Sequence, residues 1–362
     1  MVFAPSESRD SVVRFLLFFS GALYFIGFIG IYRATGSVNE WLHISTIGMN
    51  GGDHWGILSH TYSLPTFARA IGVATPEAWR AMVLVIAIAS TGLLIGTLNK
   101  ISARPLDFLI VLLAVLFSPL VRAVFNGQAD YDGITLIGIS LILLASLQLS
   151  SAASYVAAII VGLLAGITNP QQGAAALTCL AIAMVALDHS RVRQIGAAFG
   201  ALVAAAIVMR IMLWDENIPG RGEDSDLLQY IWAAITNWSK FSANILHLYA
   251  GFWVILIAAL VTVGKQRGLI KAGLLIVALL LIPLILFLML GDGSRIFSLI
   301  MAPACIFTLT RVTPKWSTRT ATIIVIAAVV VQIIYVATGQ LDFEPEFPTM
   351  YENLSSRPNP LP

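Results

Sequence analysis

The chain has 362 residues, of which 58% are hydrophobic and only 11% are charged. Because soluble domains carry about 25% charged residues, this composition excludes a soluble core and makes lipid the solvent of the surface. The formal net charge is only +2, whereas nucleic-acid binding usually requires a dense basic patch, so we predict no nucleic-acid partner. Cys179 and Cys305 both lie in apolar runs, which argues against a structural disulfide or a cysteine metal site.

Apolar runs of about 20 residues are long enough to cross a membrane as helices. They predict an all-α polytopic membrane protein with one transmembrane domain over residues 1–338. The eleven predicted spans are 12–33, 80–98, 105–122, 133–149, 153–168, 171–187, 194–213, 247–264, 270–290, 296–311 and 319–338. The fifth, sixth and tenth are short, so we expect them to be tilted, re-entrant or partly buried. The first has no small-residue cleavage site after it, so we interpret it as a retained span and not as a signal peptide.

If these spans cross the membrane in turn, the charged residues of the loops are distributed unequally between its two sides. Twelve of the 21 Lys and Arg residues fall on the side of the N-terminus, and 15 of the 19 Asp and Glu residues fall on the other side. The short basic loops contain Lys100, Arg104, Arg191, Arg193, Lys265, Arg267, Lys271, Arg311, Lys315 and Arg319. Because Lys and Arg in short loops mark the cytoplasmic side, the N-terminus is predicted to lie inside and the C-terminus outside.

The loops on the outer side contain nearly all the residues suited to chemistry. Two are long, 34–79 and 214–246, and a Pro-rich outer tail follows at 339–362. In the first loop, Asp53 lies in the sequence MNGGDHWG, where a general base or a ligand carboxylate is one interpretation and a helix cap is the other. Asp53, His54 and His60 match no standard metal-binding spacing, so we predict no metal site.

A second polar run, FNGQADYDG, interrupts two apolar segments and contains Asn126, Gln128, Asp130 and Asp132. Its amides and carboxylates suit the hydroxyl groups of a sugar, and the two acids also suit a cation. The alternative for Asp132 is a capping role at the start of the next helix.

Two arginines lie close to predicted span ends on the outer side. Arg210 is near the end of the seventh span, and Arg295 follows GDGS at the start of the tenth. Arginine near a membrane is costly and usually paired, and its planar guanidinium suits a phosphate group. The alternatives are snorkelling for Arg210 and pairing with Asp292 for Arg295.

The third outer loop contains Asn169, Gln171 and Gln172 around Pro170. Proline with polar neighbours is what a tight turn requires, so we favour a turn over substrate contact.

With these features, the topology of the whole chain resembles the GT-C superfamily of integral-membrane glycosyltransferases. These enzymes have many spans, an N-in orientation and a catalytic carboxylate in the first outer loop, and they use a lipid-phosphate sugar as donor. The resemblance implies that Asp53 is the catalytic base, with Glu40 as its rival. This sequence has Asp53-His54 where the family often has paired acids. The resemblance also implies that Arg295 contacts the donor phosphate.

The implied activity is a hexosyltransferase-like, inverting transfer from a polyprenyl-phosphate sugar to a glycan or lipid-linked acceptor. The implied location is the cytoplasmic membrane of a bacterium, with the working face periplasmic or extracellular. Such an enzyme needs no nucleotide cofactor, and the sequence has no Gly-rich nucleotide motif; a divalent metal is left open. The expected partners are the lipid-linked donor, the glycan or lipid acceptor and membrane lipids.

Two alternatives are kept. One is a lipid-linked glycan polymerase or ligase of the O-antigen type, although such proteins typically use outer-loop arginines and only Arg221 lies in loop 214–246. The other is a transporter or flippase, for which polar groups and helix breaks near the midplane are typical. Pro283 in the ninth span predicts such a kink.

Overall fold

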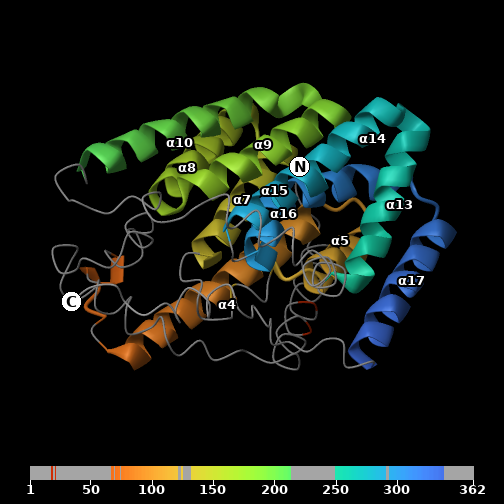
Figure 1. Cartoon of the computed structure of the whole chain (residues 1–362), viewed down its shortest axis with the longest axis horizontal. Helices are drawn as coiled ribbons and strands as arrows, with labels where there is room; N and C mark the ends of the chain where they lie inside the picture. The colour runs from red at the N-terminus through yellow and green to blue at the C-terminus, as the bar shows by residue number, and fades with distance from the viewer. Residues whose placement is uncertain are drawn as a thin grey trace, which may run out of the picture.

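A computed structural model describes residues 18, 21, 67–68, 70–73, 75–120, 124, 132–212, 249–290 and 293–337. Within these ranges the regular elements are helices, and no strand is present (Figure 1). The helices are α4 (Pro76–Ile101), α5 (Pro105–Phe117), α7 (Asp132–Leu147), α8 (Ser151–Thr168), α9 (Pro170–Leu187), α10 (Val192–Met212), α13 (Ala250–Arg267), α14 (Leu269–Ile276), α15 (Ile282–Leu290), α16 (Gly293–Val312) and α17 (Thr318–Ala337). Short 3₁₀ turns occur at η3 (His189–Arg191) and η5 (Thr313–Lys315), and a π-turn, η4, covers Val277–Leu281.

The prediction of an all-α polytopic membrane protein is confirmed at this level. Helices occupy most of each predicted span from 80–98 to 319–338, but in the span 105–122 helix α5 ends early, at Phe117, because Ser118 has an extended backbone. Among the described residues, seven helical segments are long and apolar enough to cross a membrane, and α5, α7 and α17 contain shorter apolar stretches. The span 12–33 lies outside the described residues except for Phe18 and Gly21. The total of eleven spans and the orientation stay predictions.

Three of these helices begin at a proline that follows a capping residue. The Thr75 hydroxyl accepts a hydrogen bond from the Ala78 amide at 3.2 Å at the start of α4. Arg104 precedes Pro105 at the start of α5, and Asn169 precedes Pro170 at the start of α9. Proline fits the first helical position because its fixed φ is helical and its missing N–H has no intrahelical partner there. These boundaries are therefore encoded locally.

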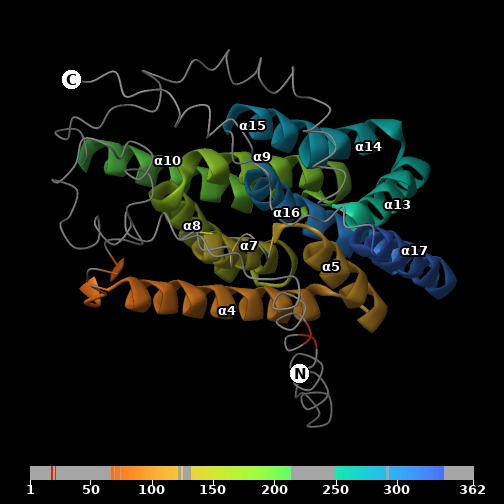
Figure 2. The same cartoon turned by 60° about the horizontal axis from the view of Figure 1, so that its bottom comes forward.

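Helix α16 lies at the centre of the bundle, between α9, α7 and α13 (Figure 2). Its segment Phe297–Lys315 is 89% buried, whereas the other spanning segments are 28–44% buried. The expectation that the tenth span is partly buried is therefore confirmed. The peripheral helices expose large apolar side chains such as Ile207 of α10 and Ile333 of α17, as helices facing lipid do.

Glycines allow pairs of helices to approach closely. Gly162 and Gly166 form a GxxxG pair on α8, and α10 runs alongside it (Figure 1). A Cβ atom on Gly162 would lie 2.0 Å from the Ala198 carbonyl oxygen, and one on Gly166 would lie 2.6 Å from that of Leu202. Small residues at such contacts are typical of helix pairs in membranes, where close van der Waals packing drives association.

The ninth span is interrupted where the sequence predicts a kink. The amide of Ile282 donates to the carbonyl of Val277, five residues earlier, which closes the π-turn before Pro283. Proline has no N–H for the usual bond to residue 279, and its ring would clash with that carbonyl. The wider turn removes this conflict, so α14 and α15 continue as one apolar span with a π-turn inside it.

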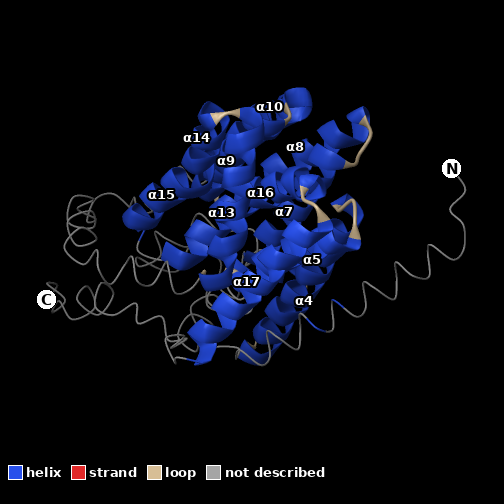
Figure 3. Cartoon of the chain, turned by 90° about the vertical axis from the view of Figure 1, so that its right-hand side faces the viewer, coloured by secondary structure: helices blue, strands red, loops and turns tan. Residues whose placement is uncertain are grey.

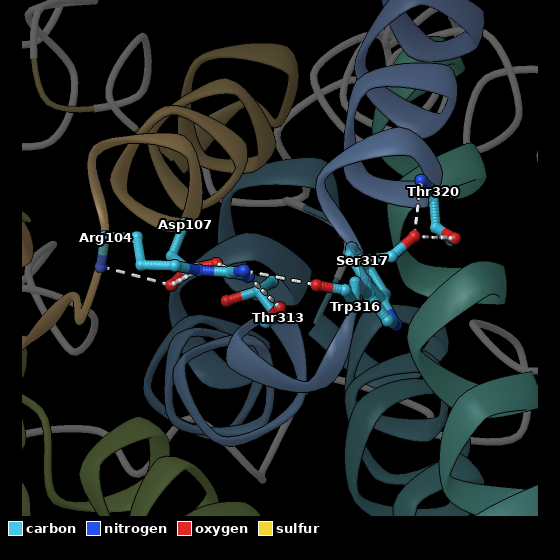
Figure 4. A network of polar contacts seen from close by, with 6 residues as sticks. All are labelled: Arg104, Asp107, Thr313, Trp316, Ser317 and Thr320. Atoms are coloured by element: carbon cyan, nitrogen blue, oxygen red, sulfur yellow. Dashed lines mark hydrogen bonds and ion pairs between the residues drawn. The ribbon is translucent and has the colours of Figure 1, made fainter.

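The predicted inner loops meet at one end of the bundle, which we call the basic end. The Arg104 guanidinium pairs with Asp107 and donates to the carbonyls of Thr313 at 2.8 Å and Trp316 at 3.2 Å (Figure 4). Hydrogen bonding to Asp107 raises the pKa of Arg104 above its ordinary value. These contacts join the loop between α4 and α5 to the loop between α16 and α17.

The remaining loops of the basic end are joined in the same way. Arg191 donates to the carbonyls of Ala145 at 2.7 Å and Leu149 at 2.6 Å, and Arg267 donates to that of Leu187. Arg311 forms an ion pair of 2.6 Å with Asp188. In Figure 3 several of the described loops, in tan, lie along the top and right of the bundle. Loops that the sequence assigns to a single side therefore share a single end.

Candidate functional site

A pocket lies between α7, α8 and α9 in the half of the bundle opposite the basic end. One face of each helix forms its walls, over residues 134–142, 161–168 and 169–177, and Pro303 of α16 closes it. α7 begins and α8 ends next to the pocket, whereas the other end of each helix lies at the basic end. The cavity volume is about 50 Å³, within about 540 Å³ of empty space that continues to the outside.

The walls of the pocket are apolar along most of their length, with side chains such as Ile139, Ile142, Val161 and Leu177. Polar side chains gather at one end, where α8 passes into α9 through Thr168, Asn169 and Gln172. The Thr168 hydroxyl donates to the carbonyl of Leu164 in its own helix at 2.7 Å. The amides of Asn169 and Gln172 are therefore the groups that distinguish this end of the pocket.

The orientation of both amides follows from their hydrogen bonds. Asn169 Oδ1 accepts from the Gln172 backbone amide at 3.1 Å as the N-cap of α9. This bond fixes Asn169 Nδ2 as a donor, and it donates to Gln172 Oε1 at 3.2 Å. A flipped Gln172 would place two donors against each other. Gln172 Nε2 therefore points away from Asn169.

Gln172 is only 4% exposed, and its Nε2 atom has no hydrogen-bond partner within the described part of the chain. A buried donor left without an acceptor costs about 1–3 kcal/mol. An acceptor atom on a bound molecule would remove this cost, because Gln172 lines the pocket. The pocket thus combines apolar walls with a lining side chain whose buried amide donor has no partner among the described residues.

The turn that the sequence favours for this loop is confirmed. Asn169 does form the turn, since it caps α9 behind Pro170. Gln172 also lines the pocket, and its contact with a substrate stays a prediction. Polar residues beside a proline identify the turn, but they do not predict that Gln172 is buried while its neighbour Gln171 is exposed.

The structure places Asp132 at the start of α7, fully buried, one turn before pocket residue Thr135. A carboxylate in the first turn of a helix is stabilised by the helix dipole. Both interpretations of Asp132, capping and ligand contact, remain compatible with this position.

Two predicted arginines lie on described backbone. Arg210 is in the last turn of α10, and Arg295 is in the first turn of α16. Arg295 precedes Pro303 of the pocket by eight residues, which is about 12 Å along a helix. The contacts of both side chains stay predictions. The other predicted site residues lie outside the described residues: Glu40, Asp53, His54, Asn126, Gln128 and Asp130.

The backbone that carries Arg295 is held by a buried contact one turn later. The hydroxyl groups of Ser298 and Tyr249 are 2.5 Å apart and fully buried. The Tyr249 ring packs edge-on against Phe252 and Phe297, with centroid distances of 5.5 and 5.3 Å. This cluster fixes the start of α16 against the start of α13.

The described residues contain no cluster of three or more His, Cys, Asp or Glu side chains able to hold a metal ion. Cys179 and Cys305 are free, buried thiols. Searches against protein-family models, curated proteins and solved structures return no significant match.

Proposed function

We propose that this protein is a membrane glycosyltransferase that takes a sugar from a polyprenyl-phosphate carrier and passes it to a glycan or lipid-linked acceptor. The observation that carries the proposal is the pocket between α7, α8 and α9. Its apolar walls suit a short apolar part of a lipid, and the buried, unpartnered Nε2 donor of Gln172 at one end suits an acceptor oxygen of a polar head. Lipids combine an apolar part with a polar head in this way, and lipid-linked sugars are among them.

The proposed reaction is a single displacement. Asp53 removes the proton from the acceptor hydroxyl as that oxygen attacks the anomeric carbon of the donor sugar. The bond from that carbon to the phosphate oxygen breaks, and polyprenyl phosphate leaves with its charge stabilised by Arg295. Attack from the face opposite the leaving group inverts the anomeric configuration. Asp132, at the pocket end of α7, and Arg210, at the end of α10, contact donor or acceptor.

The proposal includes eleven spans in the cytoplasmic membrane of a bacterium, with the N-terminus inside and the reaction on the outer face. The gathering of the short basic loops at one end supports this orientation, because that end would face the cytoplasm. The pocket then lies in the half of the bundle nearer the opposite side, where nucleotide sugars are absent and a lipid-linked donor is required.

The test is transfer of a labelled sugar from polyprenyl-phosphate donors by purified protein in nanodiscs. We expect Asp53→Asn to lower turnover by about 10²–10⁴-fold, the usual contribution of a general base. Asp224→Asn, in the acidic stretch of the outer loop 214–246, is the control and should keep wild-type turnover. Wild-type turnover in well-folded Asp53→Asn would exclude Asp53 as the base, and the absence of any covalent product across donors would exclude a transferase.

Transport is the second candidate, and two breaks inside spans favour it. They are the π-turn Val277–Leu281 and Pro303 within the central helix, since interrupted helices are typical of transporter sites. Against it, the buried charged side chains among the described residues, Asp107 and Asp132, both lie in the first turn of a helix and not at mid-span. Flux of a lipid-linked or soluble substrate in proteoliposomes, without a covalent product, would establish transport instead.

A glycan polymerase or ligase would use the same pocket with a different acceptor. Gene deletion distinguishes it from the proposed transferase. Loss of a ladder of long glycans would indicate a polymerase or ligase, whereas loss of a single side-chain sugar supports the transferase.

A further inference from the structure

The basic end contains more positive charge than its own carboxylates can balance. Its described cations are Lys100, Arg104, Arg191, Arg193, Lys265, Arg267, Lys271, Arg311, Lys315 and Arg319. Its described acids are Asp107 and Asp188, and each is already held by an arginine, at 2.7 Å by Arg104 and at 2.6 Å by Arg311. The remaining cations have no carboxylate partner among the described residues. Their counter-charge must therefore come from elsewhere.

Part of this surplus is concentrated where α13 turns into α14. Lys265 and Arg267 end α13, Gly268 reverses the chain with a φ of 91°, and Lys271 lies in the first turn of α14. Leu269 and Ile270, between these cations, are 84% and 83% exposed, more than any other large apolar side chain of the described residues. They are also the first residues of an apolar span, which places them at the membrane surface.

The loop between α16 and α17 adds another cation to this turn. Trp316 Nε1 donates to Thr262 Oγ1 at 2.8 Å, which holds the loop against the last turns of α13. Lys315 precedes Trp316 and therefore lies beside the last turns of α13, the helix that Arg267 ends. We name Lys265, Arg267, Leu269, Ile270, Lys271 and Lys315 the anchor patch.

We propose that the anchor patch binds the headgroup of an anionic phospholipid. The cations carry the opposite charge to its phosphate, and the like charges of Arg267 and Lys315 are stabilised when an anion lies between them. The exposed Leu269 and Ile270 side chains enter the acyl region beside the headgroup, a combination of basic and apolar groups typical of interfacial lipid contact. A phospholipid supplies both the negative charge and the acyl chains that these two apolar side chains contact at the membrane surface, whereas an acidic protein would supply the charge alone. The inference is independent of the proposed catalytic function.

The test is lipid retention measured by native mass spectrometry on full-length protein from nanodiscs that contain phosphatidylglycerol and phosphatidylcholine. Wild-type protein should retain phosphatidylglycerol in preference. Each Lys or Arg near the surface contributes about fivefold to the binding of anionic lipid, so Lys271→Gln with Lys315→Gln should weaken retention by about 25-fold. Leu269→Ser with Ile270→Ser should weaken retention of both lipids.

The matched control removes the same charge from the same end of the bundle. Lys100 lies in the last turn of α4, which packs against α5 and α7, so Lys100→Gln should leave the retention of phosphatidylglycerol near wild type, whereas Lys271→Gln alone should weaken it about fivefold. Equal retention of both lipids by wild-type protein would overturn the proposal. So would an equal loss in the control variant, because the effect would then reflect total charge and not this patch.

Discussion

The open amide of Gln172 gives the sharpest test of the pocket, through the variant Gln172→Leu. Leucine keeps an apolar side chain of similar size but removes the donor that has no partner among the described residues. It also removes Oε1, the acceptor for Asn169 Nδ2, but Asn169 is only half-buried, so water can replace this acceptor while Oδ1 still caps α9. Because an unpartnered buried donor costs about 1–3 kcal/mol, its removal should compensate for the lost bond. We therefore expect the melting temperature without ligand to stay the same or rise.

Ligand binding should change in the opposite direction. A hydrogen bond to a charged acceptor such as a phosphate oxygen contributes about 1.5–3 kcal/mol, so its loss weakens binding by about 10- to 150-fold. In the transferase assay this should raise KM for the lipid-linked donor. Gln171→Leu is the matched control, because Gln171 is adjacent, exposed and outside the pocket walls, and its KM should stay at the wild-type value.

A purely structural Gln172 would give another pattern. Gln172→Leu would then lower the melting temperature and leave KM unchanged in the protein that remains folded. Unchanged KM in a stable variant would refute the assignment of a ligand to the pocket, as would an equal rise in Gln171→Leu.

Three further predictions concern packing, the basic end and topology. Gly162→Leu should destabilise the bundle by about 1–3 kcal/mol or more, because its Cβ would lie 2.0 Å from a carbonyl oxygen of α10. Gly196→Ala should stabilise the bundle by up to about 1 kcal/mol, because no atom lies within 4 Å of the added Cβ. Both effects are measured as changes of the melting temperature in detergent. Asp107→Ala should cost about 1–3 kcal/mol in the same assay, because this carboxylate is 1% exposed, whereas Asp188→Ala, in a half-exposed ion pair, should cost less than about 1 kcal/mol; equal losses would contradict the role of burial. The thiol of Lys100→Cys should react with an impermeant maleimide only from the cytoplasmic side, because the two native thiols are buried and should not react. Reaction from the outside would reverse the predicted orientation.

Helix positions could be predicted from the sequence because apolar length and local caps both act over a few residues. The apolar runs locate the helices, and Pro76, Pro105 and Pro170 begin three of them for a steric reason that needs no tertiary contact. Pro283 likewise predicts an irregularity, although not that it takes the form of a π-turn. The grouping of the basic loops at one end follows from charge alone.

The order of helices in space could not be predicted in this way. The central segment Phe297–Lys315 has a mean hydropathy of 1.3, against 2.8 for the peripheral segment Leu269–Leu286. A central helix needs no lipid-facing residues, so it can accommodate Ser298 and Thr308, both fully buried. However, the segment Ala250–Arg267 has the same hydropathy of 1.3 and is only 39% buried. Hydropathy therefore does not identify the centre, and the pocket beside it stays hidden in the sequence.

Buried side-chain atoms without a hydrogen-bond partner among the described residues occur at both ends of the bundle, but Gln172 is the only one of these residues that lines the pocket, which is why we place the chemistry at the pocket end. At the basic end, arginines donate to carbonyls at or near helix ends, as Arg191 does to Leu149 and Arg267 to Leu187. Cations are favoured near helix C-termini, so these bonds are the expected use of basic loops. At the pocket end, Gln172 is buried with a donor that the described chain leaves open. Unpartnered atoms at the basic end, such as Thr313 Oγ1, carry a similar cost, but a group beside a pocket can recover that cost when a ligand supplies an acceptor oxygen.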